Sequence, residues 1–326
     1  MLLFLAGLAA LLWTFAQVGL AELAHALSNV RGAGWTVLLF YPVVSFWDAW
    51  GWRYVFPPAW RKMRIVDLFL VRLAGEAVNS TTPFLDAGGE PLKIALLHRR
   101  FGLDKPSAAS ATVLAKAFLF FSEVAFWACG LVPALVFAPA SLGWKWALSI
   151  FCVAATLLSL GVALLQSKGF FSFFLRLVGR VAPHSKLAER FRAPFEAVDA
   201  SMAAVYSGNA TAPAAAFALH FTGWVAGGVE TYLMFHVLGV PVSPVEALTL
   251  EALLQLTRTA SCVIPGNIGV QEAGMAFYAG WFGMSPSYGV ALSLLKRTRQ
   301  LLWSLIGFAV WGAYEYQLAR RESRGI

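Results

Sequence analysis

Long apolar runs, separated by short polar or basic stretches, follow one another along almost the whole chain. A membrane-spanning helix needs about 20 predominantly apolar residues to cross the hydrocarbon core of a bilayer. Six runs approach or exceed this length, and they cover residues 2–20, 35–54, 107–137, 142–165, 212–238 and 288–316. The pattern predicts an all-α membrane protein in which residues 1–326 form a single integral membrane domain with about six membrane-spanning helices.

Two polar segments rich in glycine and proline interrupt this series. The first lies within residues 68–97 and contains NSTTPFLDAGGEPLK, Asn79 to Lys93, and the second lies within residues 246–282 and contains SCVIPGNIGVQE, Ser261 to Glu272. Proline and glycine break a helix, and broken backbone at membrane depth must be surrounded by protein or water. We therefore expect two re-entrant helical hairpins. Two full spans for each segment would strain the apolar lengths.

The two broken segments share a sequence register. Six residues separate Pro83 from Glu90, and six separate Pro265 from Glu272. Further along, PSAASATVLAK ends at Lys116 and PSYGVALSLLK ends at Lys296. We interpret residues 1–138 as a first repeat and residues 139–326 as a second repeat of the same structural unit.

The distribution of charge orients these repeats. The chain is 59% hydrophobic and only 13% charged, with a net charge of +8. This composition excludes an ordinary soluble protein, and the basic residues lie between the apolar runs rather than in a nucleic-acid-binding patch. The basic stretches are residues 53–64, 93–105, 166–192 and 319–324.

Basic loops mark the cytoplasmic side of a membrane protein. We expect a multi-pass protein of the bacterial inner membrane with both termini in the cytoplasm. The first hairpin then enters from the cytoplasm and the second from outside, so the repeats are inverted, as in many transporters. We leave homo-oligomerisation open.

Residues 166–207 form an insert of a different character. Phenylalanines such as Phe173 and Phe174 alternate with basic residues such as Arg176 and Arg180, without a full apolar span. This mixture is typical of helices that lie in the membrane interface on anionic lipids. We expect the insert to contact the anionic cytoplasmic leaflet.

The paired motifs resemble a known family. Asn79-x3-Pro83 and Gly88-Gly89-Glu90, followed by Pro265-x3-Gly269-x2-Glu272, are similar to the membrane-embedded flippase-like family that includes the N-terminal domain of lysylphosphatidylglycerol synthases. The sequence GVQEAG is similar to a branch associated with hopanoid biosynthesis. Asn267 departs from the family pattern, which has more glycine and proline around the second motif.

The resemblance covers nearly the whole chain and implies a lipid flippase or transporter. Such a protein moves a lipid or lipid-linked headgroup between leaflets, in connection with hopanoid or aminoacyl-phospholipid metabolism. The aminoacyl-transferring domain of the synthases has no counterpart in this sequence, so synthase activity is not expected.

Ionisable residues inside apolar segments cost about 2.5–3.5 kcal/mol each and therefore face protein or water. Their abundance here predicts a polar cavity rather than a purely structural bundle. The candidate substrate-binding residues are Arg72, Glu76, Asn79, Glu90, Lys116, Arg258, Glu272, Lys296 and Arg299.

The two hairpin glutamates, Glu90 and Glu272, admit two interpretations. Each can stabilise a helix N-terminus, or bind an amino headgroup or a proton during transport. The basic candidates can contact phosphate near helix N-termini or form internal ion pairs. Because Glu76 and Arg258 each lie seven residues before a hairpin proline, we expect these two to pair.

Other polar residues have two possible roles as well. Asn79 and the three hydroxyl residues after it can bind a headgroup or satisfy broken backbone. The group Lys296, Arg297 and Arg299 either lines the cavity or marks the end of a helix, with re-entry at Leu301. His220, His236 and the three cysteines are expected to be packing residues.

The chain contains no nucleophile–base pair or metal-ligand spacing. We therefore expect no catalytic residues, no metal and no cofactor, and we do not expect an enzyme. The alternative is an intramembrane lipid-modifying enzyme or a subunit of a lipid-biosynthesis complex. A transporter for a small ion or an amino acid is a third possibility.

Overall fold

The computed structural model describes residues 2–30, 32–82, 88–137, 142–181, 186–208 and 211–323. Over these ranges the chain forms α-helices and short 3-10 helices and no strands, so the fold is all-α. The helices before the first broken segment are α1 (Leu2–Val18), α2 (Leu20–Ser28), the 3-10 helix η1 (Gly32–Phe40), α3 (Tyr41–Tyr54) and the 3-10 helix η2 (Pro58–Trp60). The remaining helices are α4 (Ile65–Asn79), α5 (Glu90–Phe101), α6 (Lys105–Phe137), α7 (Leu142–Lys168), α8 (Phe170–Val181), α9 (Lys186–Gly208), α10 (Thr211–Val237), α11 (Pro244–Ala260), the 3-10 helix η3 (Pro265–Asn267), α12 (Val270–Trp281) and α13 (Pro286–Ser323).

Each predicted apolar run corresponds to a helix in the structure. The first run corresponds to α1, and at its end α1 and α2 meet at an angle of 81° around Gly19. The backbone of Gly19 has a φ of 82°, a conformation that glycine adopts without steric cost. The second run begins as η1 and continues as α3, and the other four runs are single helices.

Two helical segments among the described residues are long and apolar enough to cross a membrane on those criteria alone. They are Lys105–Ala134 in α6 and Ser149–Lys168 in α7, and the bent pair α1–α2 is a third when counted as one span. Helices α10 and α13 have 27 and 38 residues, but each contains buried charged side chains, such as Glu230 and Lys296. The chain is a membrane protein, and the number of six crossings stays a prediction.

Each broken segment forms a pair of helices that pack on one another, α4 with α5 and α11 with α12. Pro83 and Asp86 lie outside the described residues. In the first pair, a Cβ atom on Gly89 would lie 1.9 Å from the carbonyl oxygen of Gly75, so only glycine allows this contact between helices. In the second pair, Gly266 and Gly269 have positive φ angles.

The backbone conformation of Asn267 explains how asparagine can stand where the family pattern has glycine or proline. Its backbone has a φ of 52°, in the left-handed region that asparagine tolerates better than most residues. Asn267 therefore occupies a turn position for which glycine is the usual choice.

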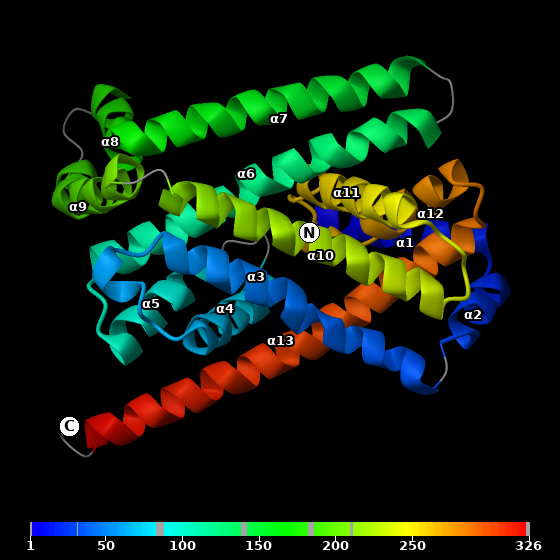
Figure 1. Cartoon of the computed structure of the whole chain (residues 1–326), viewed down its shortest axis with the longest axis horizontal. Coiled ribbons are helices and arrows are strands. Elements are labelled where there is room, and N and C mark those ends of the chain that lie inside the picture. Colours follow the sequence, from blue (N-terminus) through cyan, green and yellow to red (C-terminus); the bar gives the residue numbers. More distant parts are fainter. Residues whose placement is uncertain are drawn as a thin grey trace.

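The helices of the two halves have corresponding neighbours (Figure 1). Helix α4 packs on α13 and α11 packs on α6, so one helix of each pair contacts the long helix of the other half. Helices α5 and α12 pack on the long helices of their own halves, and α3 packs on α10 between them. This arrangement is compatible with the predicted inverted repeat. The membrane orientation of the two pairs, on which the term re-entrant depends, stays a prediction.

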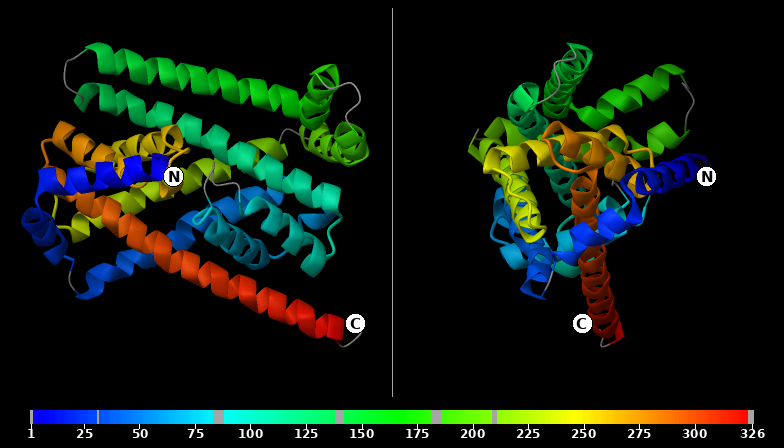
Figure 2. Two further views of the ribbon diagram at one scale, coloured as in Figure 1. Left: turned by 180° about the vertical axis from the view of Figure 1, so that it is seen from behind. Right: turned by 90° about the vertical axis from the view of Figure 1, so that its right-hand side faces the viewer.

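Helices α7, α8 and α9 lie at one edge of the molecule. Figure 2 shows α7 alongside α6, with α8 and α9 at its far end. Helix α8 exposes Phe173, Phe174 and Leu177, together with Arg176 and Arg180. The insert of residues 166–207 therefore contributes two helices at this edge, of which α9 packs on α6 and α7 and buries Val198, Met202 and Val205 in the core.

One aromatic residue lies elsewhere than expected. Tryptophans near the end of an apolar run are typical of an interfacial aromatic belt, and the run 35–54 has Trp47, Trp50 and Trp52 near one end. Trp52 is instead only 2% exposed, and its indole N–H donates to the carbonyl of Ala111 at 3.1 Å. Trp47 and Trp50 are half-buried, and their rings stack 5.6 Å apart. Because α3 packs against α6, Trp52 belongs to the core.

Candidate functional site

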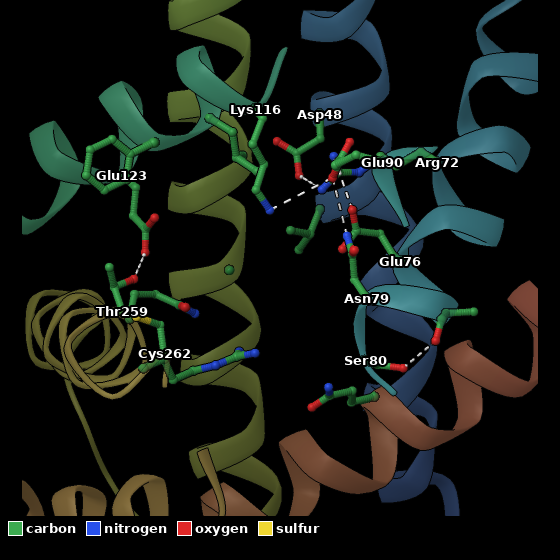
Figure 3. Close-up of a pocket in the computed structure, with 18 of the residues that line it drawn as sticks. Asp48, Arg72, Glu76, Asn79, Ser80, Glu90, Lys116, Glu123, Thr259 and Cys262 are labelled. Atoms are coloured by element: carbon green, nitrogen blue, oxygen red, sulfur yellow. Dashed lines mark hydrogen bonds and ion pairs between the residues drawn. The ribbon is translucent and has the colours of Figure 1, made fainter. Parts of the chain in front are cut away.

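A cavity of about 600 Å³ lies between the two helix pairs (Figure 3). The end of α4 contributes Asn79 and Ser80 to its wall, and the turn after α11 contributes Cys262 and Gly266. Helices α3, α5, α6, α7, α10 and α13 also contribute residues to the lining. The two broken segments, far apart in the sequence, thus line one shared space.

Seven of the nine predicted site residues line this cavity. They are Arg72, Glu76, Asn79, Glu90, Lys116, Arg258 and Arg299. Figure 3 shows the labelled polar residues in two groups, with Asp48, Arg72, Glu76 and Glu90 on one side and Glu123, Thr259 and Cys262 on the other.

Lys296 and Glu272 do not line the cavity, which corrects the prediction for both. The ammonium of Lys296 is 2.8 Å from Glu251 and 3.5 Å from Glu230, and all three residues are buried. The carboxylate of Glu272 pairs with Arg297 and accepts hydrogen bonds from the backbone N–H of Gly269 at 2.8 Å and from Ser293. Glu272 therefore stabilises the start of α12, the structural one of its two interpretations.

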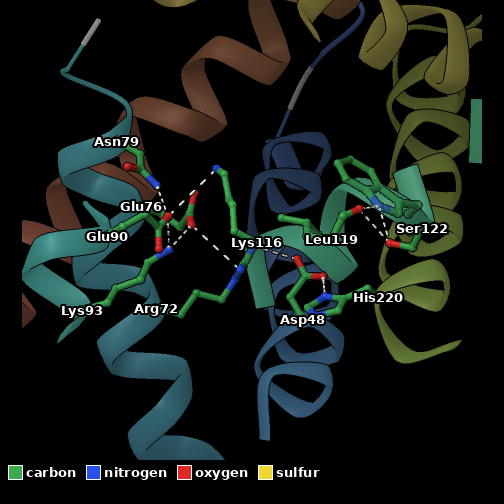
Figure 4. A network of polar contacts seen from close by, with 11 residues as sticks. Asp48, Arg72, Glu76, Asn79, Glu90, Lys93, Lys116, Leu119, Ser122 and His220 are labelled. Atoms are coloured by element: carbon green, nitrogen blue, oxygen red, sulfur yellow. Dashed lines mark hydrogen bonds and ion pairs between the residues drawn. The ribbon is translucent and has the colours of Figure 1, made fainter. Parts of the chain in front are cut away.

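The first side of the cavity contains a continuous network of ion pairs (Figure 4). Arg72 donates to Asp48 at 2.8 Å, and Lys93 bridges Glu76 at 2.9 Å and Glu90 at 3.1 Å. Lys116 extends the network, with its ammonium 4.0 Å from Glu90. The network joins α3, α4, α5 and α6, and the cavity charges on this side are largely compensated within the protein.

Two residues of this network, Asp48 and Lys93, are not among the residues predicted from the sequence. Asp48 is the one acid within the apolar run 35–54, which could have indicated its role. It also accepts from His220 at 2.8 Å. His220 is fully buried, as expected of a packing residue. Lys93 lies three residues after Glu90 on the same helix, a spacing that favours an ion pair.

The expected pair between Glu76 and Arg258 does not form. Glu76 is instead held by Lys93 and lies 3.9 Å from Arg72. A Cβ atom on Gly75 would lie 2.3 Å from Cε of Lys93, so the missing side chain at Gly75 leaves room for the stem of Lys93 to reach Glu76. Arg258 remains at the cavity wall without a carboxylate partner among the described residues.

Helix α13 is continuous from Pro286 to Ser323, so the alternative of a helix end before Leu301 is wrong. Arg299 pairs with Glu230 and lies 5.0 Å from the ring of Tyr41. Ser304 on the same helix shares a hydrogen bond with Ser80 at 2.8 Å. Helix α13 thus contacts the first helix pair at the cavity.

The side chain of Asn79 links the end of α4 to the start of α5 across the first broken segment. Its side-chain oxygen accepts from the backbone N–H of Gly89 at 2.6 Å, and its amide nitrogen is 3.4 Å from Glu90. Asn79 is 2% exposed although one edge reaches the cavity. This geometry supports the interpretation that Asn79 satisfies broken backbone.

We predict that Asn79→Ala lowers the free energy of unfolding by about 1–3 kcal/mol, because the buried N–H of Gly89 loses its acceptor. Ser80→Ala, at the neighbouring position, removes a hydroxyl that contacts the carbonyl of Ala77 and the hydroxyl of Ser304, and it should cost less because no buried backbone N–H loses its acceptor. Thermal or denaturant unfolding of both variants in detergent measures the difference. Equal stabilities for the two variants would contradict this role for Asn79.

Within the described ranges, no three histidine, cysteine, aspartate or glutamate side chains are grouped in a way that could hold a metal ion. The side chains that line the cavity include charged groups, hydroxyls, amides and the thiol of Cys262. Such groups can bind and release a polar headgroup without covalent chemistry.

Comparisons with known proteins agree on the class of protein. The family model described as the lysylphosphatidylglycerol synthase TM region matches residues 1–307. A UPF0104 membrane protein of Methanothermobacter thermautotrophicus is 24% identical over 243 residues, which cover 71% of this chain and 70% of that protein. No solved structure matches the chain.

Proposed function

This chain belongs to the family of the lysylphosphatidylglycerol synthase TM region, and we propose that it moves a lipid between the leaflets of the bacterial inner membrane by carrying the headgroup. Family membership places the protein among membrane proteins connected with lipids. The link to hopanoid or aminoacyl-phospholipid metabolism stays a prediction.

One observation supports the proposal most strongly, namely the charged cavity between the two helix pairs. Small-molecule sites in proteins have volumes of about 300–1,000 Å³, and the volume here is about 600 Å³. This space suits a polar headgroup, whereas the tails of a lipid would remain in the bilayer. A protein whose charges served stability alone has no need for such a space.

The packing of the helices suggests how access to the cavity could alternate. Because α4 packs on α13 and α11 packs on α6, each helix pair rests on the other half. A rocking motion of one half against the other would open the cavity first to one leaflet and then to the other. In this proposal both termini lie in the cytoplasm.

We further propose that α8 and α9 rest on the anionic cytoplasmic leaflet. The exposed Phe173 and Phe174 would enter the interface, while Arg176 and Arg180 would contact lipid phosphates. This contact would fix the depth of the adjoining helix α7 in the membrane.

Reconstitution into vesicles tests the proposed transport. Fluorescent lipids with anionic, zwitterionic or neutral headgroups are placed in both leaflets, and an impermeant quencher removes the signal of the outer leaflet. We expect at least one lipid to lose more than half of its signal, because lipid from the inner leaflet reaches the quencher. A plateau at half of the signal for every lipid would contradict the proposal. A change in the mass of the lipid would support the alternative of a lipid-modifying enzyme.

A further inference from the structure

Arg258 differs from the other basic residues at the cavity. Arg72 donates to Asp48, Arg299 pairs with Glu230, and Lys116 lies 4.0 Å from Glu90. The guanidinium of Arg258 has no ion pair and no hydrogen bond in the part of the chain that the structure describes. Arginine stays protonated in proteins, so a fixed positive charge lies at the cavity wall, and none of the described carboxylates neutralises it.

Among the described residues, every carboxylate that lines the cavity has a partner. Asp48 accepts from Arg72 and His220, Glu76 and Glu90 are held by Lys93, and Glu251 is held by Lys296. Glu123 accepts a hydrogen bond from Thr259 at 3.0 Å. A cationic headgroup would have to displace one of these partners, whereas an anionic group can bind to Arg258 without breaking any.

The backbone that carries Arg258 is also well defined. It lies on α11, two residues before that helix ends at Ala260, and the turn that follows is held in place. Arg297 donates to the carbonyls of Gly266 and Asn267, and the hydroxyl of Ser261 donates to the carbonyl of Thr257. Neutral groups that can hydrogen-bond line the same cavity, among them Gln300 on α13.

From this geometry we propose that Arg258 is the anion-binding residue of the cavity and receives the phosphate oxygens of a lipid headgroup. Guanidinium groups bind phosphate through two parallel N–H donors. The inference rests on the proposed transport and adds the class of substrate, a lipid with a phosphate in its headgroup. Free inorganic phosphate has the same chemistry, and the experiment separates the two sources.

The experiment measures binding to the purified full-length protein in neutral detergent. The probes are phosphatidylglycerol, diacylglycerol with the same tails, and inorganic phosphate, and the readouts are bound lipid by native mass spectrometry and the shift in Tm. We expect phosphatidylglycerol to bind more tightly than diacylglycerol. Arg258→Gln should weaken phosphatidylglycerol binding about 10- to 100-fold, since a hydrogen-bonded charge contributes that much, and Arg258→Lys should retain part of the affinity.

The control is Arg321→Gln in the last turn of α13, which removes the same charge from an exposed position outside both the cavity and the insert of residues 166–207. This variant should bind phosphatidylglycerol like the unaltered protein. If inorganic phosphate binds as tightly as phosphatidylglycerol and displaces it, Arg258 is still an anion-binding residue, but its ligand is free phosphate and not a lipid headgroup. Equal lipid binding by Arg258→Gln and the unaltered protein would overturn the proposal.

A second readout needs no lipid. Cys262 lines the same cavity four residues after Arg258, so charged thiol reagents report the local potential. With Cys129 and Cys152 replaced by alanine, an anionic methanethiosulfonate should react with Cys262 faster than a cationic one. Arg258→Gln should abolish this preference, and an unchanged preference would count against the proposal.

The two proposals can fail separately. If no lipid exchanges between leaflets but phosphatidylglycerol binding still depends on Arg258, transport fails and the anion site stands. If Arg258→Gln transports anionic and neutral lipids as the unaltered protein does, transport stands and the anion site fails.

Discussion

Lys296→Met is expected to lower the free energy of unfolding by about 3–5 kcal/mol, or to prevent folding, because removing one partner of a buried ion pair leaves an uncompensated charge. Lys296 is the cation for two buried carboxylates, Glu251 at 2.8 Å and Glu230 at 3.5 Å. Arg299 would compensate Glu230, so the loss falls mainly on Glu251. The unfolding transition of purified protein in detergent measures the effect.

Lys116→Met is the matched control for this prediction. Lys116 and Lys296 occupy the same register of the two repeats, but the side chain of Lys116 is 39% exposed and lies 4.0 Å from its carboxylate partner. A pair of this kind contributes about 0–1 kcal/mol. Equal costs for the two substitutions would contradict the account. Adding Glu251→Gln to Lys296→Met should restore part of the stability.

A disulfide between cysteines at positions 80 and 304 is expected to stop lipid transport. The hydroxyl oxygens of Ser80 and Ser304 are 2.8 Å apart, which brings the side chains within reach of a bond. Ser80 follows α4 of the first half and Ser304 lies on α13 of the second, so the bond would lock the two halves together beside the cavity. The measurement is the vesicle exchange assay with the double variant, in which the three native cysteines are replaced.

Reduction provides the control within the same sample. The reduced double variant should exchange lipid at close to the original rate, and the oxidised form should fall to the rate of protein-free vesicles. The single variants should not respond to oxidation. Full exchange in the oxidised, cross-linked form would show that the halves need not move at this point.

The sequence predicted best those elements whose formation depends on neighbouring residues in the chain and not on tertiary packing. Apolar length predicts α6, α7, α10 and α13 without reference to the rest of the chain. The bounds of α6, α7 and α10 agree with the predicted runs to within a few residues, whereas α13 continues past the run 288–316 to Ser323. Glycine and proline likewise mark the two breaks, because their effect on the backbone is also local. The bend at Gly19 was missed, because a single glycine in an apolar run does not by itself indicate a turn.

The partners of the charged residues were predicted less well, because pairing depends on how helices pack. Symmetry suggested that Glu76 and Arg258 would meet, but Lys93 reaches Glu76 over the bare backbone of Gly75. Lys116 and Lys296 occupy matching positions in the sequence. Of these two lysines, Lys296 is the one that pairs with Glu230 on α10 and Glu251 on α11. Asp48 pairs with Arg72 and His220 because α3 packs against α4 and α10, and this packing cannot be deduced from the sequence.

The central claim is that the two broken segments line one hydrated cavity, and thiol accessibility tests it most directly. The native Cys262 represents the second segment, and Ser80→Cys represents the first, each as the sole cysteine of a folded protein in oriented vesicles. The account predicts that a small membrane-impermeant maleimide labels both positions from the same side, while Cys152 alone, which is buried on α7, stays unlabelled. Failure to label either cavity position from either side, with full labelling after denaturation, would mean a dry interior and would contradict the account.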